Sequence, residues 1–363
     1  MKLQCWQDNK VFSALESAWM ALHERSKSAT IFNSVTYARI WWRHFGAPDT
    51  LQVWTVWDDD KLVGIAPLYE TTNKQDQRVL RFVGGIDVSD YLDIVSEPGR
   101  EEEIITALLA EWANVLCCPL DFHALRYASP SREAFLRLAP TFGFTVAETR
   151  EEVCPVITLP TTWEGYLKQL AGKQRREIRR KLRKAGQDEL VSWYRTPPEL
   201  IEQDLEQFFD LHILSGAEKA AFMTPAMKLF FRELAVACTE QGWLDLSFLL
   251  INGVPASTLL SFHFRNEVQL YNSGINNTLS EALSPGWLLL CYHIEYAIGL
   301  ERSRYDFLRG DEEYKFRFGG QSEPIYQIEL NKTLNDKLKT TPRENRPGLL
   351  LTDSVAGKEM ERR

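Results

Sequence analysis

The side chains best suited to chemistry lie close together near the C-terminal end, in the stretch YDFLRGDEEYKFRFGG at 305–320. Lys315 is a compact positive charge that can hold a phosphate or a developing oxyanion, and Arg317 can support it. Tyr314 can protonate a leaving group, or it only packs in the core. These residue types favour the transfer of a group from an activated, phosphate-bearing molecule.

The apolar residues that begin this stretch predict how its charges are held. Residues 305–309 have the pattern of a buried strand, and Gly310 marks a turn after it. Asp306 is expected to pair with Arg309 and so to fix the turn. Such a pair can belong to a catalytic site or can only orient a loop.

A histidine is a further candidate for proton transfer. His212 lies in the predicted helical segment FFDLHILSG, where it can act as a base, bind an acceptor or simply pack. The sequence contains no recognisable Ser-His-Asp or Cys-His arrangement, so we expect direct attack without a covalent enzyme intermediate.

One predicted helix can bind an anion at its start. SPGWLLLCYHIEYAIG begins at Ser284 as an N-cap, has Pro285 in its first turn and reaches Gly299 for a left-handed end. The backbone around Ser284 and Gly286 would present free N–H groups to a phosphate or pyrophosphate, unless the helix is capped in the ordinary way.

A strongly basic helix offers a second place for an anion. Residues 168–186, KQLAGKQRREIRRKLRKAG, contain nine Lys and Arg residues and one acid, Glu177. Like charges four residues apart, such as those of Arg176 and Arg180, destabilise a free helix, and an anionic ligand would relieve that cost. Arg176 and Arg180 are therefore predicted to bind donor phosphates, unless the basic face pairs with acids elsewhere in the chain.

The elements that must position these residues occur in the same order twice. LQVWTVWDDDKLVGIAPLY at 51–69 and LDLSFLLINGVPASTLLSFHF at 244–264 both predict antiparallel hairpins, and VQLYNSGI adds a third strand to the second. Helical patterns precede the hairpins at 11–25, 34–45, 163–185, 198–214 and 225–241. Later strands and helices are expected at 90–95, 101–116, 121–128, 285–298 and 305–309. This repeated order predicts a tandem α+β protein.

Length and composition agree with two domains. The chain has 363 residues, of which 44% are hydrophobic. We expect an N-terminal domain at 1–152, a C-terminal domain with the active site at 153–333, a charged hinge near 148–156 and a disordered tail at 334–363.

Charge and cysteine content exclude several classes of function. The formal net charge is −8, so the whole molecule has no general attraction for nucleic acid or an anionic membrane. The six cysteines have neither CxxC nor zinc-site spacing, and the longest apolar stretch contains Asn252, Gly253 and Pro255. We therefore expect reduced thiols, no metal, no membrane span and a cytoplasmic protein.

The stretch RYDFLRGDEEYKFRFG closely resembles the C-terminal signature of the CelD-like branch of the GNAT acyltransferase superfamily, which is associated with cellulose and polysaccharide biosynthesis. That branch is related to the Fem transferases, which take amino acids from aminoacyl-tRNA. The other similar stretches are KQRREIRRKLRKA, LHILSGAEKAAFM at 211–223, LYNSGINNTLSEALSPG at 270–286, FNSVTYARIWWRHFG at 32–46 and DVSDYLDIV at 87–95.

The resemblance implies tandem GNAT-like domains, each with a mixed, largely antiparallel sheet flanked by helices. It also implies transfer of an acyl group, first of all acetyl, from acyl-CoA to an amine or hydroxyl of a sugar, an amino sugar or an envelope precursor. The glycine-rich pyrophosphate loop of typical GNAT enzymes is absent, and LSEALSPG stands in its place. A Fem-type transferase that uses aminoacyl-tRNA and a catalytically inactive scaffold therefore remain alternatives.

Four further residues are expected to bind substrate. Lys219 resembles a family position that lines the donor or acceptor cleft. Asp90 and Tyr91 resemble acceptor-site positions of the Fem relatives, or they cap a strand. Asn276 lies just beyond a predicted strand and can hydrogen-bond the acceptor.

Overall fold

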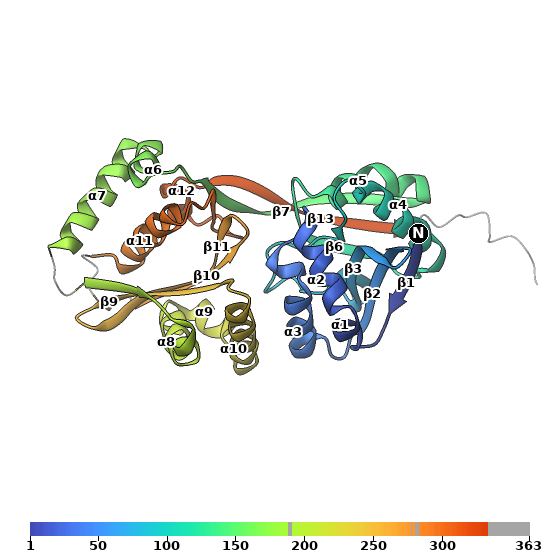
Figure 1. The fold of residues 1–363 in the computed structure, drawn as a ribbon, viewed down its shortest axis with the longest axis horizontal. Coiled ribbons are helices and arrows are strands. Elements are labelled where there is room, and N and C mark those ends of the chain that lie inside the picture. Colours follow the sequence, from blue (N-terminus) through green and yellow to red (C-terminus); the bar gives the residue numbers. More distant parts are fainter. Residues whose placement is uncertain (188–190, 277, 280–282, 333–363) are drawn as a thin grey trace, which may run out of the picture. The chain divides into compact units, whose positions relative to one another are not determined.

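All strands of the described part of the chain join in one sheet with helices on both faces. The computed structural model describes residues 1–187, 191–276, 278–279 and 283–332, and the tail expected at 334–363 lies outside them. Within these residues the sheet has 13 strands and is mixed but mostly antiparallel, which confirms the predicted α+β class (Figure 1). Among the same residues, no helix combines the length and the apolar character needed to cross a bilayer.

The first half, residues 1–158, contains the predicted hairpin and the predicted later helix. Its elements are β1 (Lys2–Trp6), α1 (Val11–Ala14), α2 (Glu16–Arg25), η1 (Ile31–Asn33), α3 (Val35–Phe45), β2 (Thr50–Asp58), β3 (Lys61–Thr72), β4 (Arg78–Phe82), β5 (Val95–Ser96), α4 (Glu101–Val115), β6 (Leu120–Arg126), α5 (Pro130–Leu138), η2 (Ala139–Phe142) and β7 (Phe144–Thr158). Helices α1 to α3 lie on one face of the strands, and α4 and α5 lie on the other (Figure 1). The connection from β4 to β6 contains β5 and helix α4, and β4 and β6 pair in parallel at Leu80 and Leu120.

The second half, residues 159–332, repeats this order. Its elements are α6 (Trp163–Gln169), α7 (Gly172–Gly186), β8 (Val191–Arg195), η3 (Pro198–Leu200), α8 (Ile201–Leu214), α9 (Ala217–Phe222), α10 (Pro225–Glu240), β9 (Leu244–Ile251), β10 (Val254–Phe264), β11 (Glu267–Ile275), α11 (Pro285–Gly299), β12 (Arg304–Asp306), α12 (Glu313–Arg317) and β13 (Gln321–Lys332). Asn252 and Gly253 join β9 to β10 with φ of 54° and 76°, as a tight hairpin turn requires. Helices α7 and α11 lie on one face, and α8 to α10 lie on the other (Figure 1).

Two helix predictions differ from the structure. The single helix expected at 163–185 is two helices, because Leu170 and Ala171 adopt extended backbone angles between α6 and α7. Gly299 is the last residue of α11, and the left-handed conformation occurs two residues later at Glu301, with φ of 58°.

Two strand predictions are too long. Of the strand expected at 90–95, only Val95 pairs, as part of β5. The strand expected at 305–309 ends at Asp306, because Leu308 and Gly310 have φ of 54° and 115° and turn the chain away from the sheet.

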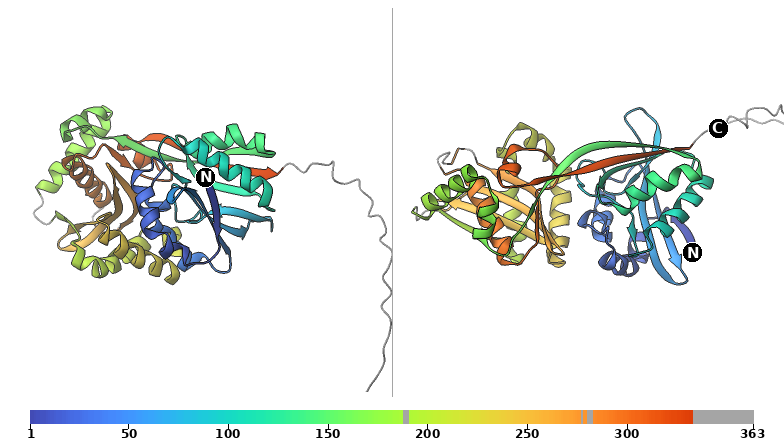
Figure 2. Two further views of the ribbon diagram at one scale, coloured as in Figure 1. Left: turned by 45° about the vertical axis from the view of Figure 1, so that its right-hand side comes forward. Right: turned by 90° about the horizontal axis from the view of Figure 1, so that it is seen from above.

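Two long strands exchange partners between the halves (Figure 2). The complete strand order is β1-β2-β3-β4-β6-β13-β7-β12-β11-β10-β9-β8, and β5 pairs with β3. The last residues of β7, 156–158, pair with β12 of the second half, whereas 325–330 of β13 pair with β6 of the first. The hinge expected at 148–156 therefore lies inside a continuous strand.

The apolar core also continues from one half to the other. The ring of Phe32 in the first half lies 5.8 Å from that of Tyr271 and 6.4 Å from that of Phe262 in the second, measured between centroids. A separate apolar cluster fills the space between α11, α6, α7 and the sheet. The surface between α11 and the strands is therefore supported by a core of its own.

Candidate active site

Strands β11 and β12 separate after a short parallel pairing and leave space for a ligand. Their pairing stops at Gln269 and Asp306, and the register between β11 and β10 shifts around Tyr271 as in a β-bulge. A cavity of about 450 Å³ opens beside α11. This apolar cavity is lined by Thr258, Leu259, Leu270, Ser273, Ile275, Leu279, Ser284, Pro285, Gly286, Trp287, Leu290 and Tyr314.

A second depression adjoins the apolar cavity at the start of α11. We call it the basic hollow; its volume is about 520 Å³, and it is lined by Lys173, Arg176, Glu177, Arg180, Lys181, Ser284, Trp287 and Arg317. Ser284 and Trp287 line both spaces. Five cations and one carboxylate in its wall make the hollow suited to a group that carries several negative charges.

The structure thus brings together the five residues predicted to bind a donor. Ser284 has φ of 53° and its side chain makes no capping bond, so it is not the ordinary N-cap that was expected. Its Oγ instead accepts a hydrogen bond of 2.5 Å from Lys181 Nζ on α7. Gly286 faces the apolar cavity, where a Cβ atom would lie 2.6 Å from Ile275 Cδ1. Arg176, Arg180 and Arg317 line the basic hollow.

Lys315 does not occupy the position that the sequence suggested. Its side chain is buried on α12, and its Nζ lies 2.8 Å from a carboxylate oxygen of Glu312. The same ammonium donates to the carbonyl oxygens of Leu308, Arg309 and Gly310 at 3.4, 2.6 and 3.3 Å. An ammonium with four oxygen neighbours is held by the turn, so Lys315 orients this turn and does not face the basic hollow.

Asp306 does not pair with Arg309. Its Oδ2 accepts a hydrogen bond of 2.7 Å from the hydroxyl of Tyr91 in the first half, and its Oδ1 accepts one of 2.8 Å from Leu308 N. Burial raises the pKa of Asp306 to about 6, against the opposing charge of Arg126 and the bond from Tyr91. The guanidinium of Arg126 stacks 3.8 Å above the ring of Tyr91. The predicted acceptor residue Tyr91 is therefore buried in a contact between the halves.

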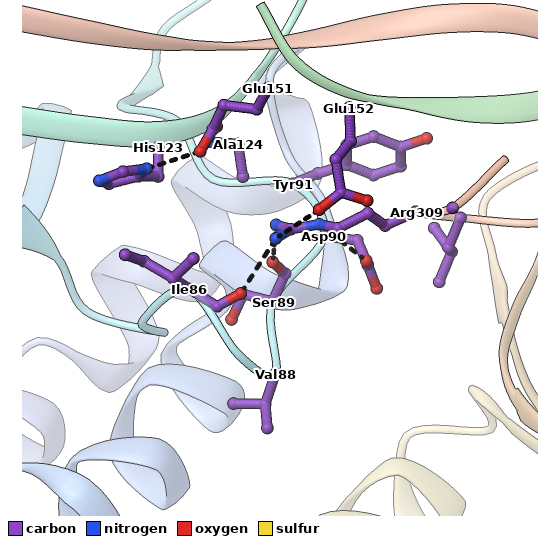
Figure 3. A network of polar contacts seen from close by, with 12 residues as sticks. Ile86, Val88, Ser89, Asp90, Tyr91, His123, Ala124, Glu151, Glu152 and Arg309 are labelled. Carbon is purple, nitrogen blue, oxygen red and sulfur yellow. Dashed lines mark hydrogen bonds and ion pairs between the residues drawn. The ribbon is translucent and has the colours of Figure 1, made fainter. Parts of the chain in front are cut away.

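Arg309 reaches from the second half to a loop of the first half (Figure 3). It donates to the carbonyl oxygens of Ile86 and Ser89 at 3.2 and 2.8 Å, and its Nε lies 3.6 Å from Asp90 Oδ1. A carboxylate oxygen of Glu152 is 3.8 Å from the same guanidinium. Burial raises the pKa of Asp90, although Arg309 and then Lys315 act against this. Asp90 is thus a positioned carboxylate beside the turn at 308–310.

Tyr314 follows the prediction more closely. It lines the apolar cavity, and its ring packs edge to face on that of Phe307. Burial raises the pKa of its hydroxyl, and the charge of Glu312 adds to this effect. Tyr314 therefore remains protonated at neutral pH and can give its proton to a leaving group in the cavity.

His212 and Lys219 lie on the opposite side of β11. His212 Nε2 donates a hydrogen bond of 3.0 Å to Asn272 Oδ1, and burial, helped by the charge of Lys219, lowers the pKa of His212 to about 4. Lys219 Nζ donates to Ser273 O at 2.6 Å and to Ser273 Oγ at 3.2 Å. Because Ser273 lines the apolar cavity, Lys219 reaches the edge of that cavity. His212 is not among the residues that line it.

Asn276 is engaged in its own turn. Its backbone N donates to Ala256 O at 2.9 Å, and its Oδ1 accepts from Thr278 N and Oγ1 at 3.0 and 2.7 Å. These bonds engage the side-chain oxygen of a residue that was expected to hydrogen-bond the acceptor.

A buried cluster of Asp245, His263 and His293 gave no signal in the sequence, because its members come from β9, β10 and α11. Asp245 Oδ2 lies 3.1 Å from His263 Nε2 and 3.7 Å from His293 Nε2, which is close enough for ligands of one metal ion. The same oxygen accepts a bond of 2.7 Å from Arg195 Nε, so a cation already balances the carboxylate. We read this cluster as an internal charge network.

Three residues that line the site were missed in the sequence. Lys181 was counted only as part of the basic helix, and Trp287 and Ser273 were not considered as site residues. Trp287 packs against Phe318 with ring centroids 4.6 Å apart and lies under Lys181 Nζ at 5.7 Å. A tryptophan three residues after Ser284, where an anion was expected to bind, was the signal that could have identified it.

Part of the second half matches a recognised domain family. Residues 172–316 match the family model described as acetyltransferase (GNAT) domain. The range includes α7 and the start of α11, which line most of the basic hollow, and it ends one residue before Arg317 of α12, which completes the lining.

Solved structures share the fold at low sequence identity. FemX is 12% identical and has a TM-score of 0.60, over 90% of this chain and 97% of that chain. A conserved protein of unknown function from Bacteroides thetaiotaomicron is 11% identical with a TM-score of 0.55, over 91% and 99%. L-PGS from Bacillus licheniformis is 9% identical with a TM-score of 0.53, over 89% and 93%.

One curated protein matches over a short segment. The N(6)-adenosine-methyltransferase non-catalytic subunit METTL14 of Xenopus tropicalis is 35% identical over 77 residues, which make up 21% of this chain and 17% of that protein. A match of this extent describes a segment and not a whole protein.

Proposed function

Because residues 172–316 form a GNAT acetyltransferase domain, we propose that this chain transfers an acyl group, first of all acetyl, from acyl-CoA to an amine or hydroxyl of a sugar, an amino sugar or an envelope precursor. The observation that carries the proposal is that the apolar cavity and the basic hollow lie next to each other and share Ser284 and Trp287 in their walls. Acyl-CoA has the matching form, with a neutral pantetheine arm at one end and several phosphate groups at the other.

The residues around these spaces fit such a donor. Phosphates would lie in the basic hollow near Arg176, Lys181 and Arg317, where cations replace the backbone loop that is absent. The pantetheine arm and the acyl group would enter the apolar cavity beside Gly286. The side chains at the hollow thus supply the charge that a glycine-rich loop would supply through its N–H groups.

The reaction expected in this site is a direct attack. The acceptor nitrogen or oxygen would attack the thioester carbon and pass its proton to a carboxylate at the turn, that of Asp90 or Glu152. The C–S bond then breaks, and the acyl group stays on the acceptor. Tyr314 would protonate the departing thiolate, since its raised pKa keeps it protonated. The acceptor would approach from the turn at 308–310, where Asp90 and the half-exposed Glu152 offer carboxylates to an amine.

A Fem-type transfer from aminoacyl-tRNA is the second candidate. It is favoured by the cations of α7 that do not line the basic hollow, such as the exposed Arg183. Those positive charges are additional to the ones that would bind the phosphates of one acyl-CoA, and they suit a longer polyanion.

Donor binding tests the proposal. We expect acetyl-CoA to raise the melting temperature and to bind with 1:1 stoichiometry in calorimetry, and dephospho-CoA to bind more weakly because one phosphate is missing. Radiolabelled acetyl transfer to a panel of amino sugars then tests the reaction. Retention of aminoacyl-tRNA that is lost with rising salt, without any effect of acetyl-CoA, would support the second candidate instead. No transfer with any donor would favour a binding scaffold.

A further inference from the structure

The edge of β11 that β12 leaves open is covered by another segment. Beyond Gln269 the backbone of β11 has no partner in β12. The chain between α8 and α9 takes that place, because Ser215 Oγ accepts a hydrogen bond of 2.8 Å from Ile275 N. Lys219 binds the same edge two residues earlier, at the carbonyl oxygen of Ser273.

Ser273 presents both its side chain and its backbone to this opening. Ser273 belongs to the wall of the apolar cavity, and its carbonyl points to the open edge, where Lys219 Nζ meets both the carbonyl oxygen and Oγ. In an antiparallel strand the N–H and the C=O of one residue point to the same side. The Ser273 N–H therefore faces the same opening as the Lys219 ammonium.

The ammonium of Lys219 has capacity for one more acceptor. It carries three hydrogens, and the two bonds to Ser273 account for two of them. Its charged neighbours are Glu312, which favours the charged form, and Lys315, which opposes it. Burial lowers the pKa of Lys219, because water is largely excluded from its ammonium. An oxyanion bound at such a site would be stabilised mainly by this cation and not by water.

We propose that Lys219 is a catalytic residue that, together with the backbone N–H of Ser273, binds the carbonyl oxygen of the acyl donor and stabilises the oxyanion formed when the acceptor attacks. This inference rests on the proposed function. The electron pair of the carbonyl double bond moves to that oxygen during attack and returns when the C–S bond breaks, and Tyr314 protonates the thiolate. Lys219 keeps its protons throughout.

Substitution of Lys219 tests the inference. In Lys219→Met we expect kcat to fall about 100- to 1,000-fold, the loss typical of one oxyanion donor, while the Kd of acetyl-CoA changes less than about threefold. Lys219→Arg keeps the charge and should retain more activity than Lys219→Met. Lys228→Met is the matched control, since this partly buried lysine of α10 lies over the ring of Phe209 and should leave kcat unchanged.

A spectroscopic measurement separates catalysis from folding. The ¹³C resonance of bound [1-¹³C]acetyl-CoA should move downfield in the wild type and return toward the free position in Lys219→Met, with the melting temperature recorded for both proteins. Equal kcat in wild type and Lys219→Met would overturn the inference. A loss of donor affinity in Lys219→Met as large as the loss in kcat/KM would also overturn it. A third contrary result is a Lys219→Arg variant as inactive as Lys219→Met, together with a wild-type rate that rises with pH, because this would indicate that Lys219 acts as a base.

The two proposals fail in different ways. Wild-type protein that neither binds acetyl-CoA nor transfers acetyl would overturn the proposed function and the role of Lys219 with it. Wild-type protein that transfers acetyl, combined with an active Lys219→Met variant, would overturn the role of Lys219 alone.

Discussion

Helices α4 and α11 occupy the same place in the two halves and begin in opposite electrostatic surroundings. Each lies in the connection between two parallel strands of the sheet. The first turn of α4 contains Glu101, Glu102 and Glu103, and Arg100 before it pairs with Glu103 and Asp58. The first turn of α11 has no acid and lies beside the cations of α7.

The packing of the two helices against the sheet also differs, as the charge at their N-terminal ends does. In the first half, a Cβ atom on Gly64 of β3 would lie 2.4 Å from Ile104 of α4, so helix and strand touch without a gap. In the second half, the apolar cavity separates the start of α11 from β11. A repeated order of elements therefore does not repeat a binding site, which needs both an open space and the right charge at the helix start.

Reversal of charge in the basic hollow should have the largest effect. In Arg176→Glu combined with Arg317→Glu, we expect acetyl-CoA to bind at least about 100-fold more weakly, because two charged contacts worth roughly 1.5–3 kcal/mol each are lost. Calorimetry measures the change. The matched control reverses two exposed cations of the first half, Lys61 and Arg137, and should leave the affinity unchanged. Equal losses in both variants would mean that net charge, and not the hollow, attracts the donor.

Removal of the buried ammonium of Lys315 should have the next largest effect, in this case on stability. We expect Lys315→Met to lower the free energy of unfolding by about 2–4 kcal/mol, because three carbonyl oxygens lose their donor inside the protein. Urea denaturation measures this. Lys332→Met at the end of β13, where Nζ meets one carbonyl oxygen of the first half, that of Leu116, should cost less than about 1 kcal/mol. A similar cost at both positions would contradict the structural role of Lys315.

His123 in the first half should make stability depend on pH. Burial alone would lower the pKa of His123, but hydrogen bonds to Asp121 and Glu151 and their charges outweigh burial and raise the pKa to about 9. The stabilisation is therefore complete below the unfolded value of 6.5 and is lost as the pH rises through about 9.

Urea denaturation of wild type and His123→Gln at pH 6 and pH 9.5 measures this dependence. The stability difference between the two proteins should shrink by on the order of 1–2 kcal/mol at the higher pH, given about 1.4 kcal/mol per unit of pKa shift and partial screening. Arg81, which binds Asp121, and Arg309, whose charge reaches Glu151, remain charged over this range. An equal difference at both pH values would contradict the ion-paired histidine.

Charge reversal at the start of α4 should have the smallest effect. Glu101→Lys combined with Glu102→Lys removes acids that favour a helix N-terminus, so we expect a loss of about 1 kcal/mol in stability. Calorimetry should still give one acetyl-CoA per chain, because the contact between Ile104 and Gly64 leaves no space for a second ligand. A second bound donor would mean that charge alone separates the two halves.

Local elements were largely predictable from the sequence. Alternating apolar residues and Asn252-Gly253 predicted β9 and β10, and Pro285 in the first turn predicted the start of α11. Errors occurred where backbone geometry is decided by distant contacts. Leu308 takes a positive φ inside a turn whose carbonyl oxygens bind Lys315, and an apolar residue gives no warning of this in sequence.

The candidate site was predictable in part. The cations of α7 and the start of α11 were both identified as anion sites, and they meet in one hollow. The partners of individual charged side chains could not be predicted from the sequence. Asp306 meets Tyr91, 215 residues away, and Arg309 meets the loop at 86–90, because β7 and β13 exchange partners and bring the first half against the second.

By itself the sequence determined the order of elements, the density of positive charge on α7 and the residue types near α12, since these follow from periodicity, propensity and composition along a few turns of chain. Only the tertiary structure decided that Lys315 is buried in a turn, that Lys181 reaches Ser284 and that Lys219 stands at the open edge of β11. The physical reason is that a long cationic side chain can reach several neighbours, and the packing of distant elements selects which oxygen it meets.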